Sequence, residues 1–269
     1  MHKEIFKNLR IIPISQIFPF EWNTQKGKSD ELLECNHIRH PFLVTRTDVN
    51  KYILLENSAD FYAYQSLGLK ELPVQIVQAD QLGISGGEIG LYAFDSDDIE
   101  QIVEFSGGSI YSDKNKPDNK FLKITQVEVT IGETKENLYL SNFESGGCSV
   151  SLENLFRYFE KHGGYRLIKN KKAMSDSLTK IHLFKAKFKL PAIRLADLIE
   201  AVKVGNLYPP MITSVQSPVR MFNIDYPVSI LKADISVREK EDFLKELLHL
   251  REQTEKTSFY QGSIYLFNR

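Results

Sequence analysis

The first third of the chain alternates short apolar runs with a helical pattern. Four runs rich in β-branched and aromatic residues predict strands at residues 9–14, 42–46, 52–55 and 72–77. The turn-forming residues 48–50 join the middle two as a hairpin. Ser58 is placed to cap a following helix that Gly68 ends, and its apolar stripe contains Phe61, Tyr64 and Leu67. This order of elements places residues 56–58 just past the end of a strand.

The second half of the chain is mixed as well. Its patterns predict strands at residues 122–131, 184–190, 220–224 and 263–267. They predict helices at residues 95–105, 151–161, 194–204 and 237–256. The alternation slips once in the first of these strands, which suggests a bulge, and the polar residues 106–120 indicate an exposed loop or domain boundary. We therefore expect an α+β protein with an N-terminal domain at 1–105 and a mixed α/β C-terminal domain at 121–269.

Composition excludes several classes of protein. Thirty-four Lys and Arg residues against 35 Asp and Glu give a formal charge of −1, which excludes a uniformly basic nucleic-acid-binding protein. Cys35 and Cys148 match no metal-finger spacing, so we expect reduced thiols and no metal site. No apolar run approaches the roughly 18 residues of a membrane span, and the N-terminus lacks a signal-peptide pattern. The expected location is cytoplasmic, without a membrane partner.

Short catalytic motifs are absent from the sequence. There is no GxxxxGK[ST] phosphate loop, and the glycine-rich stretch GISGGEIG lacks the lysine that would reach phosphates. No HExxH, GxSxG or zinc quartet is present either. Composition and periodicity alone therefore lead only to a mixed α and β protein.

Several segments of the sequence resemble segments of known protein families, and this resemblance gives further expectations. The N-terminal region contains, in order, the segments IIPISQI, FPFEW, IRHPFLV, YILLEN and YQSLGLKELPVQIV, and the C-terminal region contains GNLYPPMITSVQSPVRMFNIDYPVSILK. The first set resembles the ParB/sulfiredoxin fold, and the last is similar to the free serine kinases of staphyloferrin-type siderophore clusters. The resemblance is weakest between about residues 80 and 190. It implies ATP-dependent phosphorylation of free L-serine to O-phosphoserine, combined in some relatives with a regulatory or DNA-binding role.

The resemblance also implies roles for single residues. Glu21 stands where the family has a glutamate that acts on the serine hydroxyl as a base. The family's phosphate-binding segment, Asp-Gly-x-His-Arg, aligns with Glu56, Asn57, Ser58, Ala59 and Asp60, so only the acidic first position is retained. Losing the two cationic donors removes roughly 3–6 kcal/mol, or about 10²–10⁴ in affinity or rate. Asp60 would repel a polyphosphate unless Mg²⁺, shared with Glu56, lay between them.

Four further residues are candidates with alternative roles. Arg39 and His40 match the family and either face the ligand or make local contacts. Arg220 matches an arginine of the C-terminal motif, where it contacts substrate, joins domains or forms a surface salt bridge. Trp22 is either the wall of a pocket or a core anchor.

A basic segment supports a third reading. Residues 161–189 contain nine Lys or Arg residues against one Asp, which gives a local charge of about +8. The leading hypothesis is a degenerate serine-kinase-like protein that binds a small molecule or nucleotide and regulates siderophore or amino-acid metabolism. Its cofactor would be ATP or ADP with Mg²⁺, bound weakly, and L-serine or a nucleotide would be its ligand. The alternatives are an active serine kinase with Glu21 as base and a DNA-binding regulator, with nucleic acid not favoured.

Overall fold

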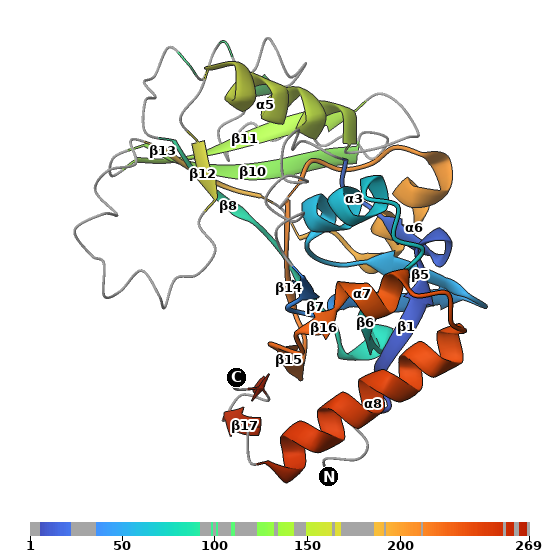
Figure 1. Ribbon diagram of the computed structural model, residues 1–269. Coiled ribbons are helices and arrows are strands. Elements are labelled where there is room, and N and C mark those ends of the chain that lie inside the picture. Colours follow the sequence, from blue (N-terminus) through green and yellow to red (C-terminus); the bar gives the residue numbers. More distant parts are fainter. Residues whose placement is uncertain are drawn as a thin grey trace. The chain divides into compact units, whose positions relative to one another are not determined.

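The chain forms two compact units (Figure 1). The computed structural model describes residues 6–22, 36–91, 98, 101, 109–110, 123–131, 134–142, 149–162, 165–167, 186–190, 192–210, 212–254, 257–260 and 264–267. The first unit combines Met1–Gly83 with Val215–Arg269, and the second comprises Ile84–Ser214. This division differs from the contiguous domains expected at 1–105 and 121–269, whereas the predicted α+β class is confirmed.

The first unit is built on a five-stranded mixed sheet in the order β1-β6-β4-β5-β2. Its strands are Leu9–Pro13, Glu71–Val77, Phe42–Asp48, Lys51–Leu54 and Ile17–Pro19. They confirm the four predicted strands and the hairpin. The sheet must curl, because only the three-residue η1 (Ile14–Gln16) joins β1 to β2 at the opposite edge. Four flat strand spacings are about 19 Å, but the linking chain spans at most about 14 Å.

One helix follows the hairpin directly. Helix α3 spans Ser58–Ser66 and buries Phe61 and Tyr64, as its periodicity predicted. Gly68 ends the helix with φ +76°, a left-handed conformation that glycine adopts without steric cost. The predicted cap is wrong: Asn57 occupies the N-cap position, and Ser58 is the first helical residue. The Ser58 hydroxyl has another partner, described with the site below.

The C-terminal segment completes the core of the first unit. Strand β15 (Arg220–Phe222) runs parallel to β18 (Ile264–Phe267), which pairs with β17 (Thr257–Tyr260). Strand β16 (Tyr226–Pro227) pairs with β3 (His37–Ile38), and helices α7 (Val228–Lys232) and α8 (Val237–Gln253) follow. One core cluster contains residues of the N-terminal and the C-terminal segments of this unit, including Leu9, Val74, Met221, Tyr226, Leu231 and Leu248. Burial of this shared apolar surface explains why the segment from β15 to α8 belongs to the first unit.

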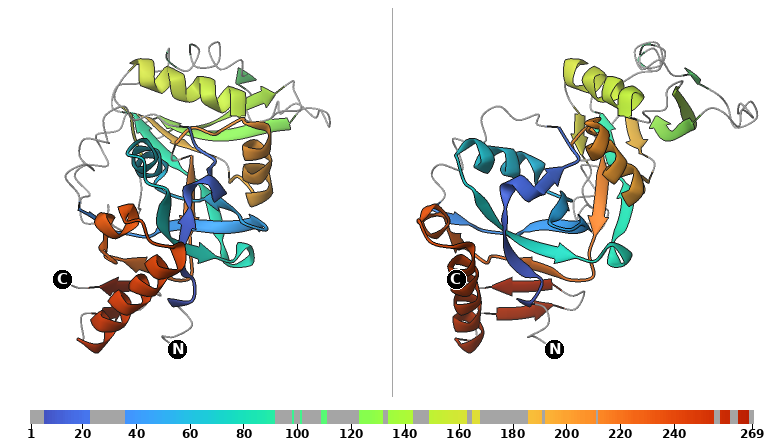
Figure 2. Two further views of the ribbon diagram at one scale, coloured as in Figure 1. Left: turned by 45° about the vertical axis from the view of Figure 1, so that its right-hand side comes forward. Right: turned by 90° about the vertical axis from the view of Figure 1, so that its right-hand side faces the viewer.

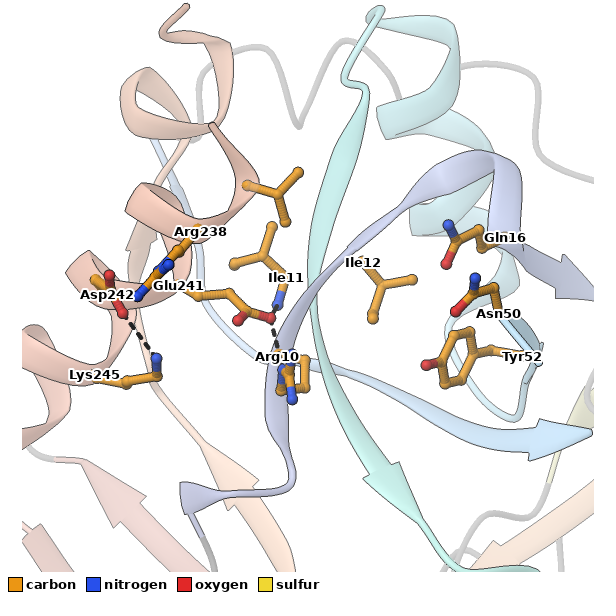
Figure 3. A pocket seen from close by; sticks show the side chains of 11 residues that line it. Arg10, Ile11, Ile12, Gln16, Asn50, Tyr52, Arg238, Glu241, Asp242 and Lys245 are labelled. Atoms are coloured by element: carbon orange, nitrogen blue, oxygen red, sulfur yellow. Dashed lines mark hydrogen bonds and ion pairs between the residues drawn. The ribbon is translucent and has the colours of Figure 1, made fainter. Parts of the chain in front are cut away.

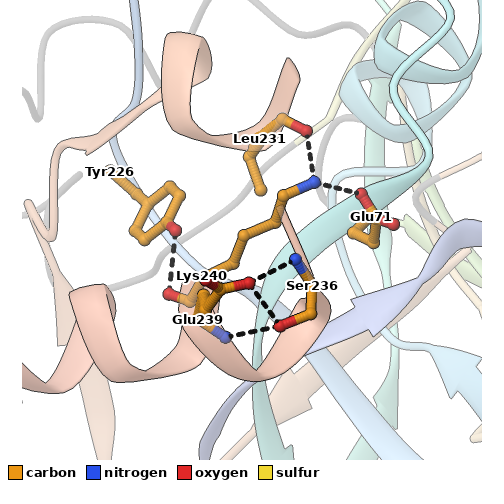
Figure 4. A network of polar contacts seen from close by, with 6 residues as sticks. All are labelled: Glu71, Tyr226, Leu231, Ser236, Glu239 and Lys240. Atoms are coloured by element: carbon orange, nitrogen blue, oxygen red, sulfur yellow. Dashed lines mark hydrogen bonds and ion pairs between the residues drawn. The ribbon is translucent and has the colours of Figure 1, made fainter. Parts of the chain in front are cut away.

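Helix α8 is fixed to this unit by polar contacts within its first turns (Figure 4). It lies next to β1, as Figures 1 and 2 show. Ser236 and Glu239 form a reciprocal capping box at its start. Buried Lys240 donates from Nζ to Glu71 Oε2 of β6 at 3.1 Å and to the Leu231 carbonyl at 2.8 Å. The Tyr226 hydroxyl donates to the Lys240 carbonyl at 2.9 Å. These contacts connect α8 with β6, β16 and α7.

The second unit contains an antiparallel sheet in the order β12-β8-β13-β10-β11-β9. Its strands are Tyr165–Leu167, Glu88–Leu91, Ala186–Lys189, Lys123–Ile131, Thr134–Asn142 and Ser109–Ile110. Helix α5 (Ser149–His162) packs on this sheet through Phe159. The centre of the Phe159 ring lies 5.1 Å from the centre of the Phe188 ring on β13. Helix α6 (Leu195–Val204) ends at Gly205 as predicted.

Two predictions for the second unit are corrected. The pairing of β10 with β11 keeps one register over nine residue pairs, so the bulge predicted there is absent. Two residues of the predicted loop at 106–120 form β9, because they find a partner on β11. The chain passes between the units in β7 (Gly83–Gly86) and β14 (Thr213–Gln216), which pair as a two-stranded sheet; the 3-10 turn η2 (Ala79–Gln81) precedes β7.

Candidate functional site

The sheet of the first unit brings several predicted site residues to one edge. Strands β2 and β5 are parallel neighbours, so their carboxyl ends lie at the same edge. Glu21 comes just after β2, and residues 56–58 come just after β5. Strand β4 is antiparallel to β5 and starts at this edge, directly after Arg39 and His40. Strand pairing therefore assembles a site from segments far apart in the sequence.

Glu21 binds the first helical residue of α3. The Ser58 hydroxyl donates to Glu21 Oε2 at 2.6 Å, and the carboxylate is only 7% exposed. One turn later, the Tyr62 hydroxyl donates to the Glu21 carbonyl at 2.9 Å. Burial and the nearby Glu21 carboxylate raise the pKa of Tyr62 above its ordinary value, so this phenol stays protonated. Sequence reasoning missed Tyr62, although its i+4 spacing from Ser58 on the helix was a usable signal.

Glu56 and Arg220 bind each other. Arg220 Nη2 donates to Glu56 Oε2 at 2.5 Å, and the guanidinium lies 5.4 Å from the centre of the Phe222 ring. The Arg220 side chain is 18% exposed, and its Nη1 is buried with no hydrogen-bond partner among the described residues. Desolvation lowers the pKa of Arg220, opposed by Glu56. Two residues predicted to hold different parts of a ligand thus form a largely desolvated ion pair.

A buried glutamine positions Arg220. Gln75 of β6 donates from Nε2 to the Val219 carbonyl at 2.8 Å and accepts from the Met221 amide at 3.1 Å. These backbone groups flank Arg220 on both sides. Gln75 is itself flanked by Leu9 of β1 and Leu43 of β4, so it lies on an inner strand of the sheet. This residue was also missed, although a polar residue inside an apolar strand is an unusual feature.

Arg39 and His40 hold the loop that follows β15. Arg39 Nε donates to Asn223 Oδ1 at 2.9 Å, and the Asn223 amide donates to His40 Nδ1 at 3.1 Å. Arg251 of α8 donates to the Asn223 carbonyl at 2.6 Å. Asn223 has a positive φ of 57°, and these three contacts fix it in that less common conformation. The hydrogen bonds of Arg39 and His40 described here therefore hold the segment before β4 to the loop after β15.

We expect the free energy of unfolding to decrease as the pH is lowered, because His40 has a lower pKa in the folded protein than in the unfolded chain. Burial, then the charge of Arg39 and of Arg220, lowers its pKa below 6.5, while Asp225 and Asp60 act in the opposite direction. Because the unfolded imidazole binds a proton at higher pH than the folded one, stability is lost as pH falls below about 6.5. Protonation also removes the acceptor for the Asn223 amide.

Thermal unfolding at pH 7.5 and 5.0 measures this effect. His40→Gln should reduce the pH dependence of Tm relative to wild type, because the amide does not titrate. His249→Gln is the matched control, since His249 is 66% exposed on α8, and it should keep the wild-type dependence. Equal slopes for wild type and His40→Gln would contradict the assignment.

The remaining predicted residues lie close by in the sequence. Asn57 has φ 62° and ψ 37° at the N-cap of α3, and Asp60 lies in its first turn. An acidic residue there stabilises the helix through its dipole but repels a phosphate at the same helix end. Trp22 follows Glu21 and is half-buried. Among the described residues no group of three His, Cys, Asp or Glu side chains could hold a metal ion.

An open pocket of about 520 Å³ lies at the opposite end of the strands (Figure 3). Asn50 and Tyr52, at the start of β5, form one side, and α8 forms another. Arg10 donates to Glu241 at 2.6 Å, and Lys245 donates to Asp242 at 2.8 Å, so most of its charges neutralise one another. None of the predicted site residues lines this pocket.

Other predictions lie outside the described residues. Cys35 and Cys148 do, as do most of the basic segment 161–189 and most of the helix expected at 95–105. No helix in the described ranges has both the length and the apolar character needed to cross a membrane.

Several solved structures have a fold similar to that of this chain. SbnI with a C-terminal truncation, from Staphylococcus aureus, matches with a TM-score of 0.72 at 18% identity, over 93% of this chain and 99% of that one. The chain has the same overall fold as SbnI. A free serine kinase variant with one glutamate replaced by alanine, in complex with ADP, matches with a TM-score of 0.63 at 16% identity, over 83% and 94% of the two chains. A conserved hypothetical protein from Pyrococcus furiosus gives a TM-score of 0.62 at 15% identity, over 83% and 97%.

These matches confirm the predicted ParB/sulfiredoxin-type fold and its likeness to free serine kinases. At the level of sequence, no protein-family model and no curated protein matches the chain.

Proposed function

We propose that this protein is a binding or regulatory member of the serine-kinase-like fold rather than an efficient kinase. Its ligand would be a small molecule or a nucleotide, in siderophore or amino-acid metabolism and in the cytoplasm. One observation carries the proposal: Glu56, at the segment aligned with the family's phosphate-binding element, is committed to Arg220 at 2.5 Å. Asp60 adds a second carboxylate in the first turn of α3. Neither side chain supplies the cationic donors that a triphosphate requires.

The residues present do not fit a tightly held ATP. Two missing charged hydrogen bonds correspond to roughly 3–6 kcal/mol, or about 10²–10⁴ in affinity or rate. Mg²⁺ between the carboxylates and the phosphates would reduce the repulsion. Any ATP or ADP that binds with Mg²⁺ is therefore expected to bind weakly.

Incubation with ATP, Mg²⁺ and L-serine tests the proposal. We expect O-phosphoserine to form about 10²–10⁴ times more slowly than with a free serine kinase assayed in parallel. Calorimetric titration with ADP should show correspondingly weak binding. Turnover at the rate of the reference kinase would contradict the proposal.

The alternative, an active serine kinase, has support from Glu21. Its carboxylate accepts a hydrogen bond from a hydroxyl at 2.6 Å, the geometry that a general base uses. Turnover that disappears in Glu21→Ala would favour this function. A DNA-binding regulator built on the basic segment stays a prediction, and salt-dependent DNA retention that weakens when Lys185, Lys187 and Lys189 become Gln would support it.

A further inference from the structure

The open pocket beside α8 is separate from the site that contains Glu21 and Arg220. All eleven of its lining residues belong to the first unit, and eight of them carry polar or charged side chains. Its volume of about 520 Å³ lies within the range of small-molecule sites. Figure 3 shows β1 between two walls, with α8 on one side and Gln16, Asn50 and Tyr52 on the other. A cavity of this size and polarity suits a small polar ligand.

Two arginines come together on the α8 side of this pocket. Arg10 Nε donates to Glu241 Oε1 at 2.6 Å, and the same oxygen accepts from the Ile11 amide at 3.3 Å. Arg238 precedes Glu241 by three residues, so the two side chains share one face of α8. Glu241 therefore holds the Arg10 guanidinium on the helix face that also carries Arg238.

Both arginines keep donors that the described part of the chain does not use. The two Nη nitrogens of Arg10 make no hydrogen bond there, and this side chain is 50% exposed. Arg238 is exposed and makes neither a hydrogen bond nor an ion pair with any described residue. Lys245 is paired with Asp242 at 2.8 Å, so these two charges offset each other. The five charged lining residues sum to +1, which favours an anion.

The opposite wall carries a tyrosine hydroxyl that is available to a ligand. Tyr52 is 7% exposed and belongs to the core of the first unit, yet its hydroxyl has no hydrogen-bond partner among the residues that the structure describes. Figure 3 shows this hydroxyl pointing into the pocket. The hydrogen bond to Glu241 raises the pKa of Arg10, and the nearby Tyr52 phenol adds to this effect. A nearly buried side chain that ends in an unpartnered polar group can satisfy it through a ligand.

We propose that this pocket binds a small phosphorylated sugar or polyol. Its phosphate lies between Arg10 and Arg238, and its hydroxyl groups face Gln16, Asn50 and Tyr52. The oxygens of a phosphate point in several directions, so they can accept from guanidiniums that come from two elements, β1 and α8. A planar carboxylate is matched by a single guanidinium. The site does not depend on the proposed function, since it shares no residue with it.

The second wall determines the neutral part of the ligand. Gln16 and Asn50 end in amides that both donate and accept, and neither amide makes a hydrogen bond with a described residue. Asn50 is fixed at the turn between β4 and β5, where its φ is 55°. Ligand hydroxyl groups can donate to and accept from these amides and the Tyr52 phenol. An apolar ligand would leave them unpaired.

Calorimetric titration of the full chain with ribose 5-phosphate and with glycerol 3-phosphate tests the proposal. We expect binding of at least one of them and no measurable binding of ribose or glycerol at the same concentrations. Ribonate, with a carboxylate in place of the phosphate, and inorganic phosphate, without the polyol, should each bind at least about tenfold more weakly. Ribonate that binds as tightly would overturn the assignment of a phosphate, and inorganic phosphate that binds as tightly would overturn that of a polyol.

Two variants locate the binding. Arg238→Gln should weaken binding of the better sugar or polyol phosphate about ten- to a hundredfold, because it removes a charged hydrogen bond. Tyr52→Phe should weaken it about three- to tenfold and keep the wild-type Tm, since the hydroxyl has no partner in the free protein. Lys232→Gln, which removes an exposed cation at the end of α7, is the control for the first variant. Tyr226→Phe is the control for the second: it loses the bond to the Lys240 carbonyl, so its Tm should fall while its affinity stays unchanged.

The outcomes separate this pocket from other sites on the chain. Equal affinities in wild type, Arg238→Gln and Tyr52→Phe would locate the binding elsewhere and overturn the proposal, as would the absence of binding by both phosphorylated probes. A lower Tm in Tyr52→Phe with unchanged affinity would assign its hydroxyl a structural role and equally overturn it. None of these results bears on the proposed function, which O-phosphoserine formation tests.

Discussion

Replacing Lys240 by methionine is expected to lower the free energy of unfolding by about 3–5 kcal/mol. Methionine preserves most of the volume of the lysine stem, so the loss comes mainly from charge. Lys240 Nζ is bonded to Glu71 at 3.1 Å, and the two side chains are 5% and 14% exposed. Without the ammonium, Glu71 keeps a nearly buried carboxylate with its counter-charge removed. The Leu231 carbonyl also loses its donor.

Urea unfolding followed by circular dichroism measures this loss. Lys245→Met is the matched control on the same helix: its pair with Asp242 is 62% and 58% exposed, so solvent screens it and we expect little change in stability. Combining Lys240→Met with Glu71→Leu should recover much of the stability, because no uncompensated charge remains. Equal effects of the two lysine replacements would show that burial of the Lys240 pair contributes little.

Replacing Gln75 by methionine is the second large expected effect, about 1.5–4.5 kcal/mol of destabilisation. The replacement is similar in size but leaves the Met221 amide without its partner, and the Val219 carbonyl keeps only the Ser217 hydroxyl as a donor. A buried unsatisfied group costs about 1–3 kcal/mol, and the lost bond to a carbonyl that keeps another donor about 0.5–1.5 kcal/mol. Because these groups flank Arg220, the variant should also loosen the pair between Arg220 and Glu56.

Two measurements separate these consequences. Urea unfolding gives the stability change, with Gln78→Met as the control, since Gln78 is exposed directly after the same strand. Hydrogen exchange at residues 219–222 reports on the attachment of β15 and should accelerate in Gln75→Met alone. A variant as stable as the control, with unchanged exchange, would contradict the positioning role of Gln75.

Most of the regular elements followed from local sequence patterns. Apolar runs located β1, β4, β5 and β6, and helical periodicity with a closing glycine located α3 and α6. Such patterns work because residues a few positions apart share one face of a helix or strand. Two further signals in the sequence were missed: Ser236 stands three residues before Glu239, and Lys240, Leu244 and Leu248 follow helical spacing. A charged residue on an apolar stripe signals a buried ion pair, but not its partner.

The candidate site residues came from the resemblance, but the contacts between them did not. Glu21, Glu56, Ser58 and Arg220 were named by their match to the family's segments, and their roles stay predictions. The predicted N-cap role of Ser58 was wrong, because a buried carboxylate from another strand end competes for its hydroxyl. The pairing of Glu56 with Arg220 spans 164 positions and depends on how Gln75 attaches β15 to the sheet.

The sequence by itself determined the local elements of this protein, where they end and which polar residues follow them. Only the tertiary structure decided that the C-terminal segment completes the first unit and that residues 56–58 bind both Glu21 and Arg220. The reason is physical. Helical and strand periodicity arises from neighbours along the chain, whereas strand order, shared core burial and ion pairs depend on segments that only folding brings together.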